Sequence, residues 1–288
     1  MTISQAILAA LAFHDIFHYP LTPSQTYSYL PVEAGLSRFR RSLEQLITED
    51  KIAMKSQLVC LKSRGAIVKS CLARKKASAK KLKKAGFYAK SLRFIPSIKL
   101  VGITGALAME NANTDDDIDL VIITAKGTLW TTRLFANLLL HPYRRKPHQP
   151  HTKNKACLNL FLDESSLKIG TQNLYIAHEI AQMRPIWQRQ KTYQRFVNAN
   201  SWIKKYLPNW QPYPADSFVT YQHDLSLLTS HYALVEIFFK KFQLWYMRPR
   251  MTTEKVGDKQ LFFHPGNTHE WVLKEYQRKI RILSRNYH

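Results

Sequence analysis

Apolar positions recur at helical spacing through the first part of the chain and at strand spacing directly after it. Apolar side chains recur every three or four positions over three segments, which predicts helices over 3–13, 22–30 and 37–49. Two short apolar runs, at 52–55 and 58–61, predict strands that are joined as a hairpin. Residues 1–65 are therefore expected to form one small domain.

This order of helices and hairpin looks like a winged helix domain, whose DNA-binding versions place the third helix in the major groove. Arg38 and Arg41 lie at the start of that helix and are candidate nucleic-acid contacts. Glu44 and Glu49 reduce the positive charge of the same helix. Packing of this domain against the rest of the molecule, or against a protein partner, is therefore an equal alternative.

Residues 66–97 follow as a predicted helical connector with one basic face. From Lys69 to Lys99 the chain carries eleven lysines and arginines and no acidic residue, while its apolar side chains keep a helical spacing. An acid-free run of this length favours contacts with a phosphate backbone over a merely solvated surface. The candidate contacts are Lys80, Lys81, Lys83 and Lys84.

Two apolar, β-branched runs predict strands at 98–103 and 118–123, with a glycine turn and a short helix between them. Residues two apart in a strand point to the same face, so Asp117 and Asp119 are expected to project together. Two adjacent carboxylates repel each other unless a cation lies between them, and a divalent cation is the expected solution. A solvated turn is the alternative, but the order of the flanking elements favours a metal site.

The turn before the short helix is suited to phosphate. Gly105 can adopt a backbone conformation that side chains forbid, and free N–H groups at a helix start attract phosphate. Thr104, Gly105 and Ala106 are therefore candidate nucleotide-binding residues. A phosphate site beside a metal-binding carboxylate pair is the equipment for nucleotidyl or phosphoryl transfer.

Gly105-Ala106, ten intervening residues and Asp117-Ile118-Asp119-Leu120 together resemble the core motif of the polymerase-beta-type nucleotidyltransferase superfamily. The resemblance implies a small mixed β-sheet flanked by helices, a magnesium- or manganese-dependent attack on the α-phosphate of a nucleoside triphosphate, and release of pyrophosphate. It assigns Asp117 and Asp119 to the metal and Gly105 to the phosphates. Ala106 departs from the family, because a serine that contacts phosphate is common there.

The resembled family can carry a third carboxylate on a later strand, and the best candidate strand here is 156–162. Strict alternation places Cys157, Asn159 and Asp163 on its polar face. Asn159 occupies the expected mid-strand place of the acid, but an amide cannot take a proton from an attacking hydroxyl. Either Asp163 or Glu164 substitutes, the enzyme works without that base, or the catalytic step has been lost.

The remaining segments are predicted as helices and loops. A helix over 129–140 precedes a basic, acid-free loop at 141–155, whose His141, His148 and His151 have poor zinc spacing and are expected to be ordinary loop residues. Beyond Gly170, helices are expected over 175–187, 218–246 and 267–285. The predicted α+β chain is therefore divided into four parts: 1–65, the connector 66–97, a nucleotidyltransferase core 98–170 and a C-terminal helical region 171–288.

Charge and cysteine content add the expected partner and compartment. The 288 residues carry a formal charge of +23, which indicates a polyanionic partner, with nucleic acid favoured over an anionic membrane surface. The three cysteines lack paired spacing and are expected to be buried thiols in a reducing compartment. The sequence has neither a membrane-spanning run nor a signal peptide at its N-terminus, so a cytoplasmic location is expected.

Together these features predict a magnesium-dependent nucleotidyltransferase that moves a nucleoside monophosphate from a triphosphate to an acceptor, with RNA or DNA as the leading acceptor. The alternative is a catalytically degenerate module of the same fold that binds nucleic acid or nucleotide, which Ala106 and Asn159 favour. An enzyme that modifies a small molecule or a protein is a third interpretation.

Overall fold

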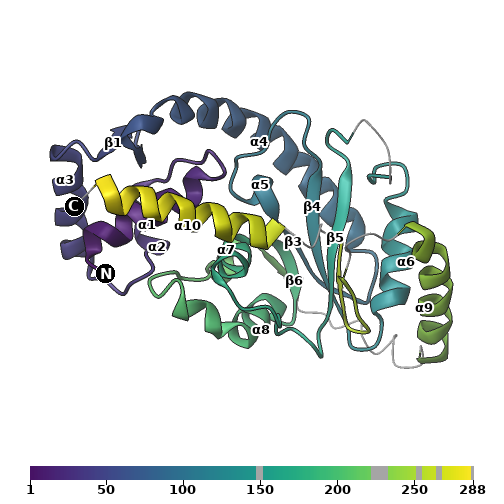
Figure 1. Cartoon of the computed structure of the whole chain (residues 1–288). Coiled ribbons are helices and arrows are strands. Elements are labelled where there is room, and N and C mark those ends of the chain that lie inside the picture. The colour runs from purple at the N-terminus through teal and green to yellow at the C-terminus, as the bar shows by residue number, and fades with distance from the viewer. Residues whose placement is uncertain (147–151, 222–232, 251–254, 264–267, 287–288) are drawn as a thin grey trace.

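The computed structural model describes residues 1–146, 152–221, 233–250, 255–263 and 268–286. Within these ranges the chain is an α+β protein, as expected, and a mixed sheet of seven strands lies at its centre (Figure 1). From edge to edge the strands are β7 (Val219–Tyr221), β6 (Arg184–Arg189), β3 (Ile98–Ile103), β4 (Ile118–Thr124), β5 (Ala156–Asp163), β9 (Gln260–Phe262) and β8 (Lys255–Val256). The predicted glycine turn and aspartate pair belong to the central strands β3 and β4, which pair antiparallel, while β4 and β5 pair parallel.

The N-terminal segment forms the predicted helices and hairpin, which are α1 (Ile3–Asp15), α2 (Pro23–Ser28), α3 (Leu36–Thr48), β1 (Ile52–Lys55) and β2 (Leu58–Leu61). Thr2 and Thr22 begin the first two helices as N-caps, because each hydroxyl accepts a hydrogen bond from the backbone N–H of a glutamine three residues later. Apolar side chains of this segment share one buried cluster with the central sheet, Leu30 and Leu100 among them. The segment therefore packs against the rest of the molecule.

A long helix, α4 (Ala66–Leu92), forms the predicted connector and leads into β3 (Figure 1). The side chains of Ala85, Ala89 and Leu92 are fully buried in its C-terminal half, where the helix packs on the sheet. A basic face opposite these residues is exposed to solvent, and it carries Lys76, Lys80, Lys83, Lys84 and Lys90.

The chain beyond Gly170 is less helical than expected. Its first helix, α7 (Leu174–Gln182), ends before Pro185, and the following residues pair with β3 as strand β6. Proline lacks the N–H group that a helix interior needs, which explains why the helix predicted over 175–187 is wrong in its second half. Two other strands, β8 and β9, also come from this part of the chain and extend the sheet beyond β5.

The helix predicted over 218–246 is present only in part. Its described residues form β7 and then α9 (Ala233–Met247), whereas 222–232 lie outside the described ranges. Helix α9 lies beside α6 (Leu129–Leu139), and Glu236 accepts hydrogen bonds from the backbone N–H groups of Trp130 at 2.6 Å and Thr131 at 2.9 Å (Figure 1). This carboxylate therefore caps the N-terminus of α6. Among all helices of the described ranges, none combines the length and the apolar composition needed to cross a bilayer.

The two faces of the sheet bury different apolar clusters. On one face, Val121 and Ile123 pack with α7 and with α8 (Thr192–Ala199). On the other face, Leu120 and Ile122 pack with α4 and α6. Strand β4 is therefore buried on both sides, which accounts for its unbroken apolar run.

The predicted final helix forms as α10 (Thr268–Asn286) and lies across α1 and α7 (Figure 1). Val272 is fully buried against Phe13 of α1. The carboxylate of Asp15 is also buried and pairs with Arg64 and Lys279, each at 2.6 Å. A buried carboxylate needs such partners, and the pair with Lys279 joins α10 to the N-terminal segment.

Candidate functional site

Strand β3 ends in a turn that fits tightly against β4. The N–H of Thr104 donates a hydrogen bond to the carbonyl oxygen of Asp119 at 3.1 Å. Gly105 follows with φ of +65°, a left-handed conformation that favours glycine, and begins the short helix α5 (Gly105–Ala108). A Cβ atom at Gly105 would lie 2.9 Å from the Oδ2 atom of Asp119. The absence of a side chain at this position therefore lets the turn approach the Asp119 carboxylate.

The loop between α5 and β4 is held by a buried lysine. The ammonium group of Lys81 donates hydrogen bonds to the carbonyl oxygens of Thr114 at 3.0 Å and Asp116 at 2.5 Å, and to the side chain of Asn154 at 3.1 Å. Only 1% of Lys81 is exposed, so its prediction as a nucleic-acid contact is wrong. Lys81 instead fixes the backbone that leads directly into Asp117.

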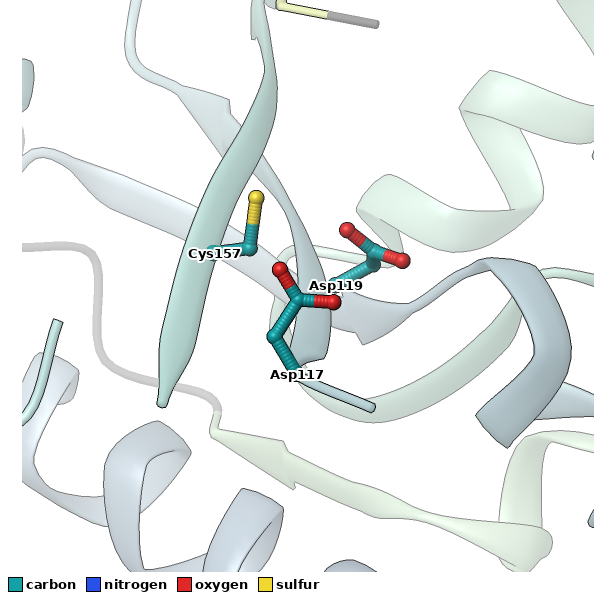
Figure 2. A group of neighbouring side chains, drawn as sticks. All are labelled: Asp117, Asp119 and Cys157. Atoms are coloured by element: carbon teal, nitrogen blue, oxygen red, sulfur yellow. The ribbon is translucent and has the colours of Figure 1, made fainter. Parts of the chain in front are cut away.

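Asp117 and Asp119 project together, as the strand spacing predicts, and a third side chain joins them. One potential ligand atom from each of Asp117, Asp119 and Cys157 lies within 4.8 Å of the others. Figure 2 shows the three side chains converging from two neighbouring stretches of the sheet. Cys157 stands directly opposite Asp119 in the pairing of β4 with β5, so Cys157, and not the predicted Asn159, is the β5 residue beside the aspartate pair.

The predicted roles of Asn159 and Asp163 depended on strict alternation along β5, and the structure breaks that alternation. Leu120 pairs with Leu158 but Val121 pairs with Leu160, so Asn159 is an extra residue without an opposite neighbour on β4. One added residue exchanges the two faces of the strand beyond it, which removes Asp163 from the face that carries Cys157.

Asp163 lies at the far end of β5, opposite Thr124. Five residues along β4 separate Thr124 from Asp119, roughly 16 Å at the rise of a strand. The Asp163 carboxylate accepts hydrogen bonds from the N–H groups of Gly127 at 2.6 Å and Ser165 at 2.8 Å. The expectation that Asp163 serves as the base beside Asp119 is therefore wrong, and this carboxylate instead fixes the loop after β4.

Burial and like charge act together on the aspartate pair. Burial, followed by the nearby charge of Asp117, raises the pKa of Asp119 from its ordinary value to about 7. The same two influences, burial first and then the carboxylates, raise the pKa of the Cys157 thiol. Arg145 partly offsets the negative charge, because its guanidinium pairs with Asp117 at 2.8 Å. The charge of the aspartate pair is therefore only partly compensated by a cation of the protein itself.

A cavity of about 660 Å³ adjoins the turn, and Thr104, Asn159 and Glu179 are among the residues that line it. Most of its lining is apolar, including Ile180 and Phe196. The Thr104 hydroxyl is buried and makes no hydrogen bond within the described residues. Glu179 lines the same cavity as Thr104, and burial, followed by the charge of Asp119, raises its pKa to about 7. Sequence reasoning missed Glu179 because an acid on a predicted amphipathic helix looks like an ordinary surface residue.

The other predicted contact residues do not belong to this cluster and are exposed to solvent. Lys80, Lys83 and Lys84 are exposed on α4, and Arg38 and Arg41 are exposed on α3. The predicted basic loop is described only in part, since His148 and His151 lie outside the described ranges.

Comparison with models of known protein families, with curated proteins and with solved structures found no match to this chain.

Proposed function

We propose that this protein is a nucleotidyltransferase that uses a divalent cation to transfer a nucleoside monophosphate from a triphosphate to an acceptor. The observation that carries the proposal is the packing of the Gly105 turn against Asp119. A Cβ atom on Gly105 would lie 2.9 Å from the Asp119 carboxylate, so the phosphate-binding turn and the carboxylate pair form one unit. A triphosphate needs both parts next to each other, because its oxygens bind the backbone N–H groups and share the cation.

The residues at this place fit a divalent cation. Asp117 and Asp119 supply carboxylate oxygens on one side of the sheet, and two such groups are stabilised together by a positive charge between them. Mg²⁺ and Mn²⁺ are the first candidates, since both take carboxylate oxygens and phosphates. When bound, the cation would neutralise the charge that develops on the phosphates during the transfer.

The side chains around the pair have complementary roles in binding the triphosphate. The Thr104 hydroxyl, buried and unpaired within the described residues, supplies the phosphate contact that Ala106 lacks. The guanidinium of Arg145 is about half exposed, so it is free to turn from Asp117 to a phosphate once a cation neutralises the carboxylate. An oxygen of the acceptor attacks the α-phosphorus, a new P–O bond forms, the bond to the β-phosphate breaks and pyrophosphate leaves. The acceptor proton passes to water.

Nucleic acid is the acceptor class that the surface favours. The exposed lysines of α4 form a face without acidic residues, and Lys81 of the same helix donates a hydrogen bond to the backbone of Asp116, directly before Asp117. A phosphate backbone bound along α4 therefore lies next to the site.

The test is release of pyrophosphate from labelled nucleoside triphosphates, with Mg²⁺ or Mn²⁺ and total RNA or DNA as acceptor. Asp119→Asn is expected to abolish both release and metal-dependent binding of ATP. The matched control is Asp115→Asn, because Asp115 lies on the same loop but is exposed and outside the cluster. Metal-dependent ATP binding that is unchanged in Asp119→Asn would reject the proposal.

A binding module without catalytic activity is the second candidate. It is favoured by Cys157, which stands opposite Asp119 on β5, where the resemblance implies a third carboxylate. This candidate predicts metal-dependent ATP binding with no pyrophosphate release from any acceptor pool.

A further inference from the structure

The aspartate pair has a sulfur atom as its third neighbour. The Sγ of Cys157 and one oxygen each from Asp117 and Asp119 lie within 4.8 Å of one another (Figure 2). The parallel pairing of β4 with β5 sets this arrangement, because Cys157 is the direct neighbour of Asp119. The three donors are thus held by the two central strands of the sheet and by the residue that precedes β4.

Cations differ in how they accept such a donor set. Mg²⁺ requires near-ideal octahedral coordination by oxygen, and a thiolate is a poor ligand for it. Zn²⁺ accepts thiolate and carboxylate together, and commonly takes three protein ligands and leaves a fourth position for water or substrate. We infer that this site binds Zn²⁺, or a similarly thiophilic divalent cation, in preference to Mg²⁺, through Asp117, Asp119 and the thiolate of Cys157. Binding transfers the thiol proton to solvent as the metal–sulfur bond forms.

Two further observations indicate that the cluster is built to hold a ligand. The Thr104 hydroxyl is nine-tenths buried and unpaired within the described residues, on a turn whose backbone N–H donates to the backbone carbonyl oxygen of Asp119. Arg145 already places a positive group on Asp117, at 2.8 Å. A metal cation therefore replaces a cation that the protein itself supplies.

The inference replaces the Mg²⁺ or Mn²⁺ of the proposed function with Zn²⁺ or a similarly thiophilic cation, and it rests on the carboxylate pair described there. Its test is a titration of the full chain, stripped of metal and free of nucleotide, with Co²⁺ as the probe. We expect a sulfur-to-cobalt charge-transfer band in the near ultraviolet. Competition against Co²⁺ should give a much lower Kd for Zn²⁺ than for Mg²⁺.

Variants of Cys157 identify the donor. Partners that only support a metal ligand typically change affinity about 10–100-fold, so Cys157→Ser should remove the band and weaken Zn²⁺ binding at least about tenfold. Cys157→Asp should also lose the band and should shift the preference towards Mg²⁺. Cys60→Ser and Cys71→Ser are the matched controls and should keep the band, because neither thiol belongs to the cluster.

One measurement does not depend on any variant. X-ray absorption of the Zn²⁺-loaded wild-type chain should show a sulfur neighbour at about 2.3 Å. Absence of that neighbour, equal affinity for Zn²⁺ and Mg²⁺, or a band that persists in Cys157→Ser would overturn the inference. A cobalt–thiolate band in a protein that never binds ATP would keep this inference and reject the proposed function. ATP binding with Mg²⁺ but without a cobalt–thiolate band would reject this inference and keep the proposed function.

Discussion

At the scale of single residues, Gly105 is a position that leaves no room for a side chain. Its φ is +65°, and a Cβ atom would lie 2.9 Å from the Asp119 carboxylate. Gly105→Ala is therefore expected to lower the free energy of unfolding by about 1–3 kcal/mol through backbone strain. It should also displace Asp119 and weaken divalent-cation binding at least about tenfold, as loss of support for a ligand does. Thermal unfolding and calorimetric titration measure the two effects.

Gly127 offers a matched control within the same fold. It also has a positive φ, of +70°, but an added Cβ atom would meet nothing within 4 Å. Gly127→Ala should show the loss of stability without the loss of metal affinity. If Gly105→Ala and Gly127→Ala lost the same divalent-cation affinity, the close approach of Gly105 to Asp119 would not explain the loss.

At the scale of elements, α4 connects the N-terminal segment to β3 and also holds the segments around Asp117 in place. Lys81 donates to two backbone carbonyl oxygens and one side chain of the segments around Asp117. Lys81→Met removes the donor of all three acceptors. A fully buried unpaired group costs about 1–3 kcal/mol, and because these acceptors are only partly buried, the expected total loss is of the size of one such group, about 1–3 kcal/mol. Denaturant unfolding measures it.

Lys80 is the control for this prediction because it is the adjacent lysine of α4 and is exposed. Lys80→Met should change the free energy of unfolding by no more than about 0.5 kcal/mol. If Lys81→Met were as stable as Lys80→Met, the hydrogen bonds of Lys81 to the segments around Asp117 would not stabilise the fold.

The sequence predicted those elements that a short stretch of consecutive residues specifies. Strands β3 and β4 and the Gly105 turn are consecutive patterns, so their positions and the joint projection of Asp117 and Asp119 could be predicted. The place of Cys157 could not, since it depends on which residues of β5 lie opposite β4. The extra residue Asn159 then exchanges the two faces of β5 beyond it, so the strict alternation predicted for this strand does not hold.

Tertiary contacts decided the other differences. Lys81 belongs to an acid-free run of lysines, and nothing local to the sequence separates it from its exposed neighbours. The helix predicted over 175–187 ends before Pro185, which is a local cause, but the residues after it form β6 because the edge of β3 offers a partner for pairing. Such non-local pairings are absent from any short window of sequence.

At the scale of the whole molecule, two histidines lie buried where α1 meets α7. The His14 ring lies 5.2 Å from that of His178, and both are almost completely buried. Burial lowers the pKa of His14 from 6.5 to about 4, against a smaller opposing effect of its hydrogen bond to Ala10, and burial also lowers the pKa of His178. Both rings are therefore neutral in the folded protein near pH 7.

This arrangement makes the folded state sensitive to acid. Below pH 6.5 the unfolded chain protonates His14 while the folded chain does not, so stability is present above that pH and falls as the pH drops to about 4. At about 1.4 kcal/mol per pH unit, His14 alone contributes a loss of about 3 kcal/mol. His14→Phe should flatten the slope of unfolding free energy against pH in this window, as measured by denaturant unfolding.

His141→Asn is the control, because His141 is exposed on the loop after α6. It should leave the slope as steep as in the wild type. A His14→Phe variant with an unchanged slope would show that the acid sensitivity originates elsewhere.

The joining of α1 to α10 has a consequence for synthesis of the chain on the ribosome. Asp15 and Lys279 are 264 positions apart in sequence. At about 5–20 residues per second, translation delivers α10 some tens of seconds after α1 has emerged. During that interval Phe13 and Ile16 lack their buried neighbour Val272. The nascent N-terminal segment therefore exposes an apolar surface to which a chaperone can bind. This surface is covered only after α10 has been translated.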